Sequence, residues 1–153
     1  MNQKIETPLT AKERRRIPRH RIPEQPPAER ARNFHEVNLG YTAEMARMEA
    51  LRCIQCPKPK CVEGCPVKIQ IRDFVALVAE GEFEKAAQVV KQDNSLPAVC
   101  GRVCPQEEQC EAQCVLGKKG EAVAIGNLER FVADFERENG LAKALIPADR
   151  TGR

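Results

Sequence analysis

The sequence predicts an all-α fold, a small helical domain wrapped around cysteine-rich loops and preceded by an extended, Pro-rich arm. Three observations support this prediction. Apolar residues recur at intervals of three and four positions in several segments, as they do in helices packed on a core. No stretch of useful length alternates apolar and polar residues in the way of a half-buried strand. The eight cysteines gather in two dense groups, one on either side of a predicted helical hairpin.

The first two expected helices lie on either side of the first cysteine group. Residues 42–52, TAEMARMEALR, begin with Thr42, whose side chain is suited to accept a hydrogen bond from the first helical turn. Residues 69–80 carry Ile, Phe and Val side chains at helical spacing, and Gly81 follows as a helix-ending residue. The intervening residues 53–66 contain several prolines and are expected to form a loop.

The remaining expected helices surround the second cysteine group. Residues 82–93, EFEKAAQVVKQD, complete the hairpin, and residues 97–105 are expected to form a second loop. A short helix is expected over residues 106–114. The last helix covers residues 125–138, where apolar side chains again recur at helical spacing, and an Asn-Gly pair stops it.

We expect an arm at residues 1–33, a helical domain at residues 34–140 and a linker at residues 141–153. Residues 1–32 contain nine lysines and arginines against four acidic residues, a net charge of +5. Prolines interrupt the arm, acidic residues separate its arginines, and no aromatic residue precedes Phe34, so it does not resemble a nucleic-acid-binding segment. We expect the arm to lie along the protein or along a partner subunit, with no nucleic-acid partner.

The expected cellular compartment rests on two segments that the sequence does not contain, a membrane span and a secretory signal. No run of about 18 apolar residues is present, so neither a membrane span nor a membrane partner is expected. The N-terminal stretch MNQKIETPLTAKERRRIPRH has no apolar core of the kind found in secretory signals. These features predict a cytoplasmic protein, whose thiols stay reduced. Eight clustered cysteines then favour metal binding over disulfides.

The first cysteine group reads C-x2-C-x4-C-x3-C-P, with Cys53, Cys56, Cys61 and Cys65 followed by Pro66. It resembles the bacterial ferredoxin run C-x2-C-x2-C-x3-C-P, with two extra residues. In that run three cysteines hold one iron–sulfur cluster, and the fourth, before the proline, binds a different cluster. The spacing therefore favours cluster ligands, with Cys65 turned away from the other three.

The second cysteine group reads C-x3-C-P-x4-C-x3-C, through Cys100, Cys104, Cys110 and Cys114. Cys110 and Cys114 stand four apart, so a helix would place both on one face, and they either share a cluster or diverge to two. Two four-iron clusters have eight ligand positions, which the eight cysteines match. Zinc is the alternative, but two such dense groups exceed the ligands that one zinc ion takes, and neither histidine lies near them.

Longer runs extend this pattern. The segments NFHEVNLGYTAEMARMEALRCIQC, CVEGCPVKIQIRDFVALVAEGEFEKA, CGRVCPQEEQCEAQCV and AIGNLERF together resemble the N-terminal double-cluster domain of the small subunit of bacterial glutamate synthase. The same domain occurs in dihydropyrimidine dehydrogenase and in the large subunit of NADH-dependent ferredoxin:NADP oxidoreductase. The resemblance covers residues 33 to about 138 and implies an all-α domain that holds two [4Fe–4S] clusters.

The resemblance also implies a ligand set. One cluster would take four thiolates, from Cys53, Cys56, Cys61 and Cys114. The other would take three thiolates and one carboxylate, from Cys65, Cys104, Cys110 and Glu129. Cys100 would then be a spare, small apolar residue, and Glu129, within GNLERF, would not be the solvated helix acid that its residue type alone suggests. A carboxylate is a harder donor than a thiolate, so the two clusters would be unequal.

The implied function is one-electron relay, with no catalytic acid or base in this chain. In the family the domain precedes a part that binds FAD and NAD(P)H, and no G-x-G-x-x-G fingerprint of such a part is present here. We therefore expect the chain to be a domain of a longer oxidoreductase. Its partner would be a glutamate synthase large subunit, or another oxidoreductase subunit and possibly ferredoxin.

Two other functions are kept as alternatives. In the first, the chain is a subunit-docking module whose clusters are mainly structural, and in the second it is a zinc-binding protein.

For the relay, cationic residues beside the ligands would stabilise reduced clusters. Five such residues flank the cysteines in sequence, namely Arg52, Lys58, Lys60, Lys68 and Arg102. Of these, Lys58 and Lys60 are expected to be solvated surface residues.

Overall fold

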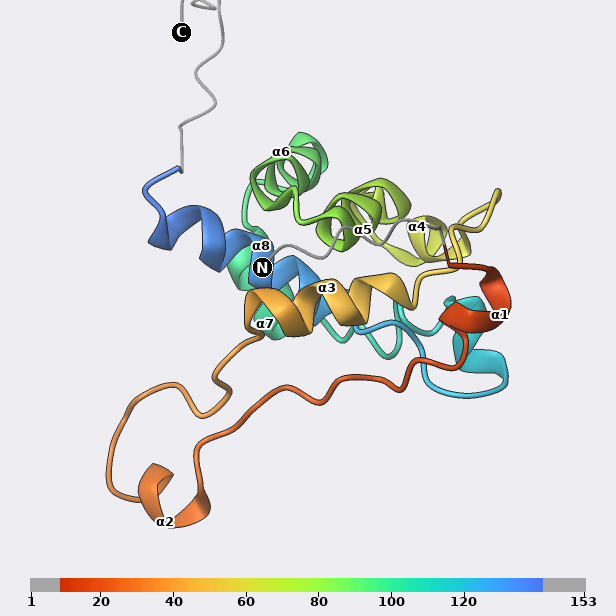
Figure 1. Ribbon diagram of the computed structural model, residues 1–153. Helices are drawn as coiled ribbons and strands as arrows, with labels where there is room; N and C mark the ends of the chain where they lie inside the picture. Colours follow the sequence, from red (N-terminus) through yellow and green to blue (C-terminus); the bar gives the residue numbers. More distant parts are fainter. Residues whose placement is uncertain (1–8, 142–153) are drawn as a thin grey trace, which may run out of the picture.

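The computed structural model describes residues 9–141 and confirms the all-α fold (Figure 1). Within this range, the β pairing consists of one isolated bridge between Glu24 and Asn38. No helix in the described range is long and apolar enough to cross a membrane. The helices, in chain order, are α1 (Ala11–Arg14), α2 (Pro27–Arg30), α3 (Ala43–Leu51), α4 (Lys60–Gly64), α5 (Ile71–Glu80), α6 (Phe83–Asp93), α7 (Pro97–Val103), the 3-10 helix η1 (Val115–Lys118) and α8 (Ile125–Glu138).

The hairpin of α5 and α6 forms as its sequence pattern predicts. The predicted stripe on α5 is buried, and Phe74 and Val78 have no exposed surface. Gly81 ends α5 in the left-handed conformation, with a φ of 84°, which a glycine adopts without steric cost. On α6, Phe83 and Val90 face the same core.

Helix α8 packs against α6 and α7 and closes the core. Leu128 and Val132 are fully buried, as their spacing predicts. Phe131 and Phe135 meet Phe83 of α6 edge-on, with ring centroids 4.9 and 5.1 Å from that of Phe83. Such edge-to-face contacts add to the stabilisation that apolar burial provides.

Helix α3 begins where it was predicted to begin. The Thr42 side chain accepts a hydrogen bond from the backbone N–H of Met45. The buried face of the helix contains Ala46 and Glu49, whereas Met48 is 39% exposed. Alanines on this face let α3 lie close to α5, with which it makes extensive contact.

The segment between α6 and α8 differs from the prediction. The expected loop over residues 97–105 contains α7, which starts with Pro97 in its first turn, where the missing N–H of proline costs no hydrogen bond. The expected helix over residues 106–114 is instead a series of turns, closed by bonds such as that from the N–H of Glu111 to the carbonyl of Gln106.

The stretch of the arm that follows α1 lies along the protein, which is one of the two expected arrangements, and it is bonded there through Ile17 and His20. Figure 1 shows the chain after α1 running beside α3, and then the segment that contains α2 projecting from the helical body. The Glu24–Asn38 bridge closes this projection at its base. The expected linker over residues 141–153 lies outside the described range except for Leu141.

Candidate metal centre

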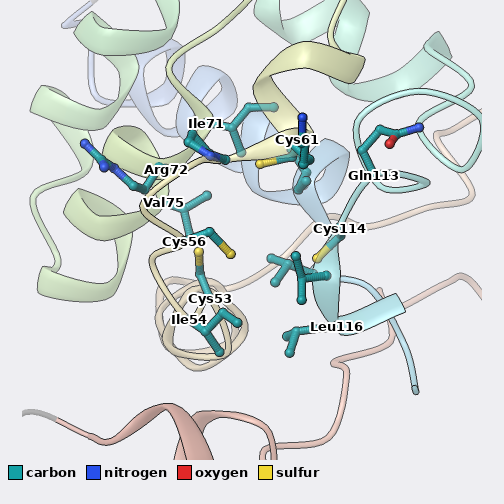
Figure 2. Close-up of a pocket in the computed structure, with 15 residues that line it drawn as sticks. Cys53, Ile54, Cys56, Cys61, Ile71, Arg72, Val75, Gln113, Cys114 and Leu116 are labelled. Carbon is teal, nitrogen blue, oxygen red and sulfur yellow. The ribbon is translucent and has the colours of Figure 1, made fainter. Parts of the chain in front are cut away.

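Four cysteine thiols face one cavity, although they come from three separate segments of the chain. Figure 2 shows Cys53, Cys56, Cys61 and Cys114 around this cavity, which lies beside α5. Its walls are otherwise largely apolar, with contributions from Ile71, Val75, Leu116, Val123 and Ile125. These four cysteines are the set that the family resemblance implies for one cluster, and we call them the first site.

Local structure places each thiol of the first site. Cys53 follows the C-terminus of α3, where its N–H bonds to the carbonyl of Ala50. Gln55 has a positive φ of 54°, which turns the chain between Cys53 and Cys56. Cys61 lies in the single turn of α4, and Cys114 immediately precedes η1. The first site therefore depends on contacts between segments that are about 50 residues apart.

The thiols of the first site influence one another electrostatically. The pKa of Cys61 is raised to about 12, first by burial and then by the charges of Cys53, Cys114 and Cys56. Burial also raises the pKa of Cys53, with further contributions from Cys114 and Cys56. Both thiols are therefore neutral near pH 7 in the cluster-free protein, and they must lose protons when they bind iron.

A second group of cysteines lies at the opposite end of α4. Cys65 caps α4 and is 8% exposed, Cys104 caps α7, and Cys110 lies in the turns that follow α7. The pKa of Cys110 is raised to about 12, first by burial and then by the charges of Glu111 and Cys65. The pKa of Cys104 is raised to about 11 by burial, by Cys100 and by Cys65 among others. The two cysteines that stand four apart in sequence thus diverge, Cys110 to this group and Cys114 to the first site.

Glu129 belongs to this second group and is not a solvated acid. It lies on α8, is only 7% exposed, and its charge acts on both Cys104 and Cys110. Burial raises the pKa of Glu129 to about 7, against the effect of a hydrogen bond of 2.6 Å that Asn94 donates to its Oε1. We call Cys65, Cys104, Cys110 and Glu129 the second site.

Cys100 lies beside the second site. Its thiol donates a hydrogen bond of 3.7 Å to the side-chain oxygen of Asn94 and is close enough to Cys104 to raise the pKa of that residue. Asn94 also accepts a bond from the N–H of Leu96 and so fixes the start of α7. No motif or periodicity identified Asn94, which joins Cys100 to Glu129.

Two glycines allow the backbone contacts that bring the second site together. A Cβ at Gly64 would lie 2.6 Å from the carbonyl oxygen of Gln109, so α4 meets the turns that carry Cys110 through this glycine. A Cβ at Gly101 would lie 2.5 Å from the backbone nitrogen of Arg130. Since neither backbone can yield that far, the close approach of α7 to α8 requires a glycine at this position.

The charged residues that flank the cysteines in sequence are mostly compensated. Arg52 is 4% exposed and forms a 2.6 Å ion pair with Glu49. Arg102 pairs with Glu36 and with Asp134. Lys58, Lys60 and Lys68 are exposed, Lys60 pairs with Glu63, and Lys68 bonds to a backbone carbonyl, so the expected surface position of Lys58 and Lys60 is confirmed.

The arrangement fits a cluster better than a single metal ion. In residues 9–141, no three His, Cys, Asp or Glu side chains are close enough together to hold one ion. The four thiols of the first site instead surround a shared cavity, and a cubane needs such spacing because each ligand binds a different iron. The donor set and the apolar walls thus match a four-iron cluster.

These features define a cysteine-ligated iron–sulfur domain with a helical shell, a class that serves single-electron transfer. Comparison with known proteins agrees. The chain belongs to the family described as dihydropyrimidine dehydrogenase domain II, 4Fe-4S cluster, which matches residues 30–141. It is therefore a [4Fe–4S] electron-transfer domain of the type found in oxidoreductases.

Individual relatives bear related names. The chain is 37% identical over 134 residues to a glutamate synthase [NADPH] small chain of Azospirillum brasilense, and the match covers 86% of this chain and 28% of that protein. It is 37% identical over 131 residues to the protein of that name in Escherichia coli K12, and this match covers 86% of this chain and 28% of that protein. It is 35% identical over 106 residues to the NAD-dependent dihydropyrimidine dehydrogenase subunit PreT of the same strain, with 69% and 26% covered. The chain thus spans about a quarter of the length of these relatives.

Proposed function

We propose that this domain holds two [4Fe–4S] clusters and relays single electrons between a flavin- and NAD(P)H-dependent part and a second active site or partner subunit. The observation that carries the proposal is the division of the ligand residues into two groups. Cys53, Cys56, Cys61 and Cys114 line one cavity. Cys65 and Glu129 are among the charges that act on both Cys104 and Cys110, together with Cys100 for the former and Glu111 for the latter, whereas the charges that act on Cys61 come from the first site.

In this proposal the four thiols of the first site bind one cluster. Side chains of α5 line the same cavity as these thiols and form part of its wall. When bound, a cubane accepts and releases one electron at a time. The apolar wall formed by Ile71, Val75 and Leu116 excludes water, and exclusion of water is one of the means by which a protein sets a cluster's reduction potential.

The second site would bind the other cluster through three thiolates and the carboxylate of Glu129. Two observations support Glu129 as a ligand: it is buried, and it lies close enough to act on Cys104 and Cys110. Asn94 orients it by donating to one carboxylate oxygen, Oε1, and the other oxygen receives no hydrogen bond from the described residues. A carboxylate in place of a thiolate would make the second site electronically different from the first.

The wider role is inferred from the relatives. Two of them are named as small chains of NADPH-dependent glutamate synthase, and we propose the same type of enzyme for this chain. The partner would then be a glutamate synthase large subunit, and the flavin would lie in a part joined to residues 141–153. The division into an arm at residues 1–33 and a cluster domain at residues 34–140 is part of the same proposal.

The ligand assignment is tested by anaerobic iron and sulfide analysis of two variants. Cys100→Ser should keep about eight irons per chain, because two four-iron cubanes remain fully ligated. Glu129→Ala should damage or alter the second site and leave the first intact. Loss of a whole cluster in Cys100→Ser, with Glu129→Ala unchanged, would show that Cys100 and not Glu129 completes the second site.

A further inference from the structure

We propose that Arg14, in the N-terminal arm, raises the reduction potential of the cluster at the first site by placing beside Cys53 a positive charge that forms no ion pair with any acid of residues 9–141. The inference rests on the proposed function, because it requires a cluster at that site. It assigns a role to a segment that precedes the residues matched by the family, which begin at residue 30. It also names a residue that no motif in the sequence identifies.

The geometry of Arg14 is specific. Its Nη1 donates hydrogen bonds of 3.0 Å to the carbonyl of Cys53 and 3.1 Å to the carbonyl of Leu51, and its Nε donates to the carbonyl of Leu9. Leu51 is the last residue of α3, so its carbonyl is one of those that a helix C-terminus leaves without a partner. The guanidinium is thus fixed at the helix end that delivers the first ligand, where a cation is favourable.

The charge of Arg14 reaches the thiol. Its guanidinium is hydrogen-bonded to the backbone carbonyl of Cys53, so the positive charge is held beside the residue whose sulfur binds the cluster. A cation at this position favours negative charge at the sulfur. Adding an electron to the cluster also increases negative charge there, so the same cation favours the reduced state.

Other arginines near the first site are paired with acids. Arg52 meets Glu49, and Arg72, which lines the cavity of the first site, meets Asp73 at 2.9 Å. Within residues 9–141, Arg14 makes no ion pair with a carboxylate, and its polar partners are backbone carbonyls. A paired arginine and its acid largely cancel at a distance, whereas Arg14 has no ion-paired acid among the described residues.

The arm is held in place on both sides of Arg14. Thr10 and Glu13 form a reciprocal capping box at the start of α1. Further along, the carbonyl of Ile17 accepts from Arg52, and the N–H of His20 donates to Glu49. Since these contacts do not involve Arg14, replacing its side chain should leave the path of the arm unchanged.

The test is a redox titration of the two clusters by electron paramagnetic resonance, in wild type, Arg14→Gln, Arg14→Lys and Arg15→Gln. Arg15 is the matched control, because it is exposed and carries the same charge one residue further along the arm. Cys114→Ser, which alters or removes the first-site signal alone, assigns each signal to its site. Because only the cluster potentials are read, the test does not depend on enzyme activity.

At the wild-type midpoint of the first-site cluster, Arg14→Gln should lower the ratio of reduced to oxidised cluster about tenfold, a shift of about 59 mV to lower potential for one electron. The second-site potential should not change, and Arg14→Lys and Arg15→Gln should stay near wild type. Equal potentials in Arg14→Gln and Arg15→Gln, or equal losses in Arg14→Gln and Arg14→Lys, would overturn the inference.

Loss of a cluster is also decisive. If Arg14→Gln lacks the first cluster, Arg14→Lys carries the test: a wild-type potential supports the role of charge, and a lowered potential or a lost cluster overturns it. A wild-type protein without two reducible clusters would instead refute the proposed function, so the two failures are distinguishable.

Discussion

Replacing Glu49 with alanine should destabilise the protein more than any exposed charge replacement. The Glu49 side chain has no exposed surface and accepts three hydrogen bonds. The donors are the guanidinium of Arg52 at 2.6 Å and the backbone N–H groups of His20 and Ala124, both at 2.8 Å. One carboxylate therefore joins α3 to the arm and to the segment that enters α8.

The magnitude follows from what the substitution leaves behind. Arg52, with a side chain 5% exposed, would remain as a buried cation without its acid. Breaking a buried ion pair in this way costs about 3–5 kcal/mol. For a chain of this size, each kcal/mol lowers the midpoint of thermal unfolding by about 2–4 °C, so the loss should be on the order of 10 °C. The double variant Glu49→Ala/Arg52→Met should recover part of it, because no unpaired charge then remains.

The assay is anaerobic thermal unfolding of the cluster-loaded protein at one scan rate, since a bound cofactor makes unfolding irreversible and rate-dependent. Glu24→Ala is the control. Glu24 pairs with Arg30 on the surface, where the two side chains are 57% and 40% exposed, and this pair should contribute less than about 1 kcal/mol. If Glu49→Ala unfolds at the same temperature as Glu24→Ala, the argument from buried charge is wrong.

Two further predictions concern packing and pH. Gly101→Ala should lower the free energy of unfolding by about 1–3 kcal/mol, because the new Cβ meets the backbone of Arg130, and this outweighs the helix preference of alanine. Thermal unfolding measures the loss. The control is Val99→Ala, at an exposed position on the same helix, which should change stability by less than about 0.5 kcal/mol. Burial raises the pKa of Tyr41 to about 12, above its usual value of about 10, so the folded state holds the proton more tightly and stability should fall as pH rises through this window. Tyr41→Phe should be flatter over the same range in denaturant titrations, and an equal slope in both proteins would contradict the assignment.

Local patterns in the sequence predicted the helices that pack on the core. The α5 stripe with its terminal glycine, the following helix α6 and the whole of α8 form where they were expected, because one buried face fixes each of them. α7 was missed because Pro97 reads as a loop residue, although proline in a first helical turn costs nothing. The helix expected over residues 106–114 is wrong: these residues form turns, and Cys110 and Cys114 belong to different groups.

The cysteines were identifiable from spacing, but their surroundings were not. Cys65 lies apart from the other three cysteines of its motif and close to Cys110, as the ferredoxin pattern suggested. Glu49, Asn94 and Arg14 escaped notice because each acts on residues that lie far away in sequence. The Arg14 bond to Cys53, for example, spans 39 positions, and no periodicity or motif encodes a contact of that range.

The central claim is that the two groups of ligands hold two redox-active clusters. Anaerobic reductive titration of purified wild-type protein, with iron and acid-labile sulfide measured on the same sample, tests it most directly. We predict about eight irons, about eight sulfides and uptake of about two electrons per chain, one for each cubane. A protein that contains stoichiometric zinc, lacks labile sulfide and takes up no electrons would contradict it.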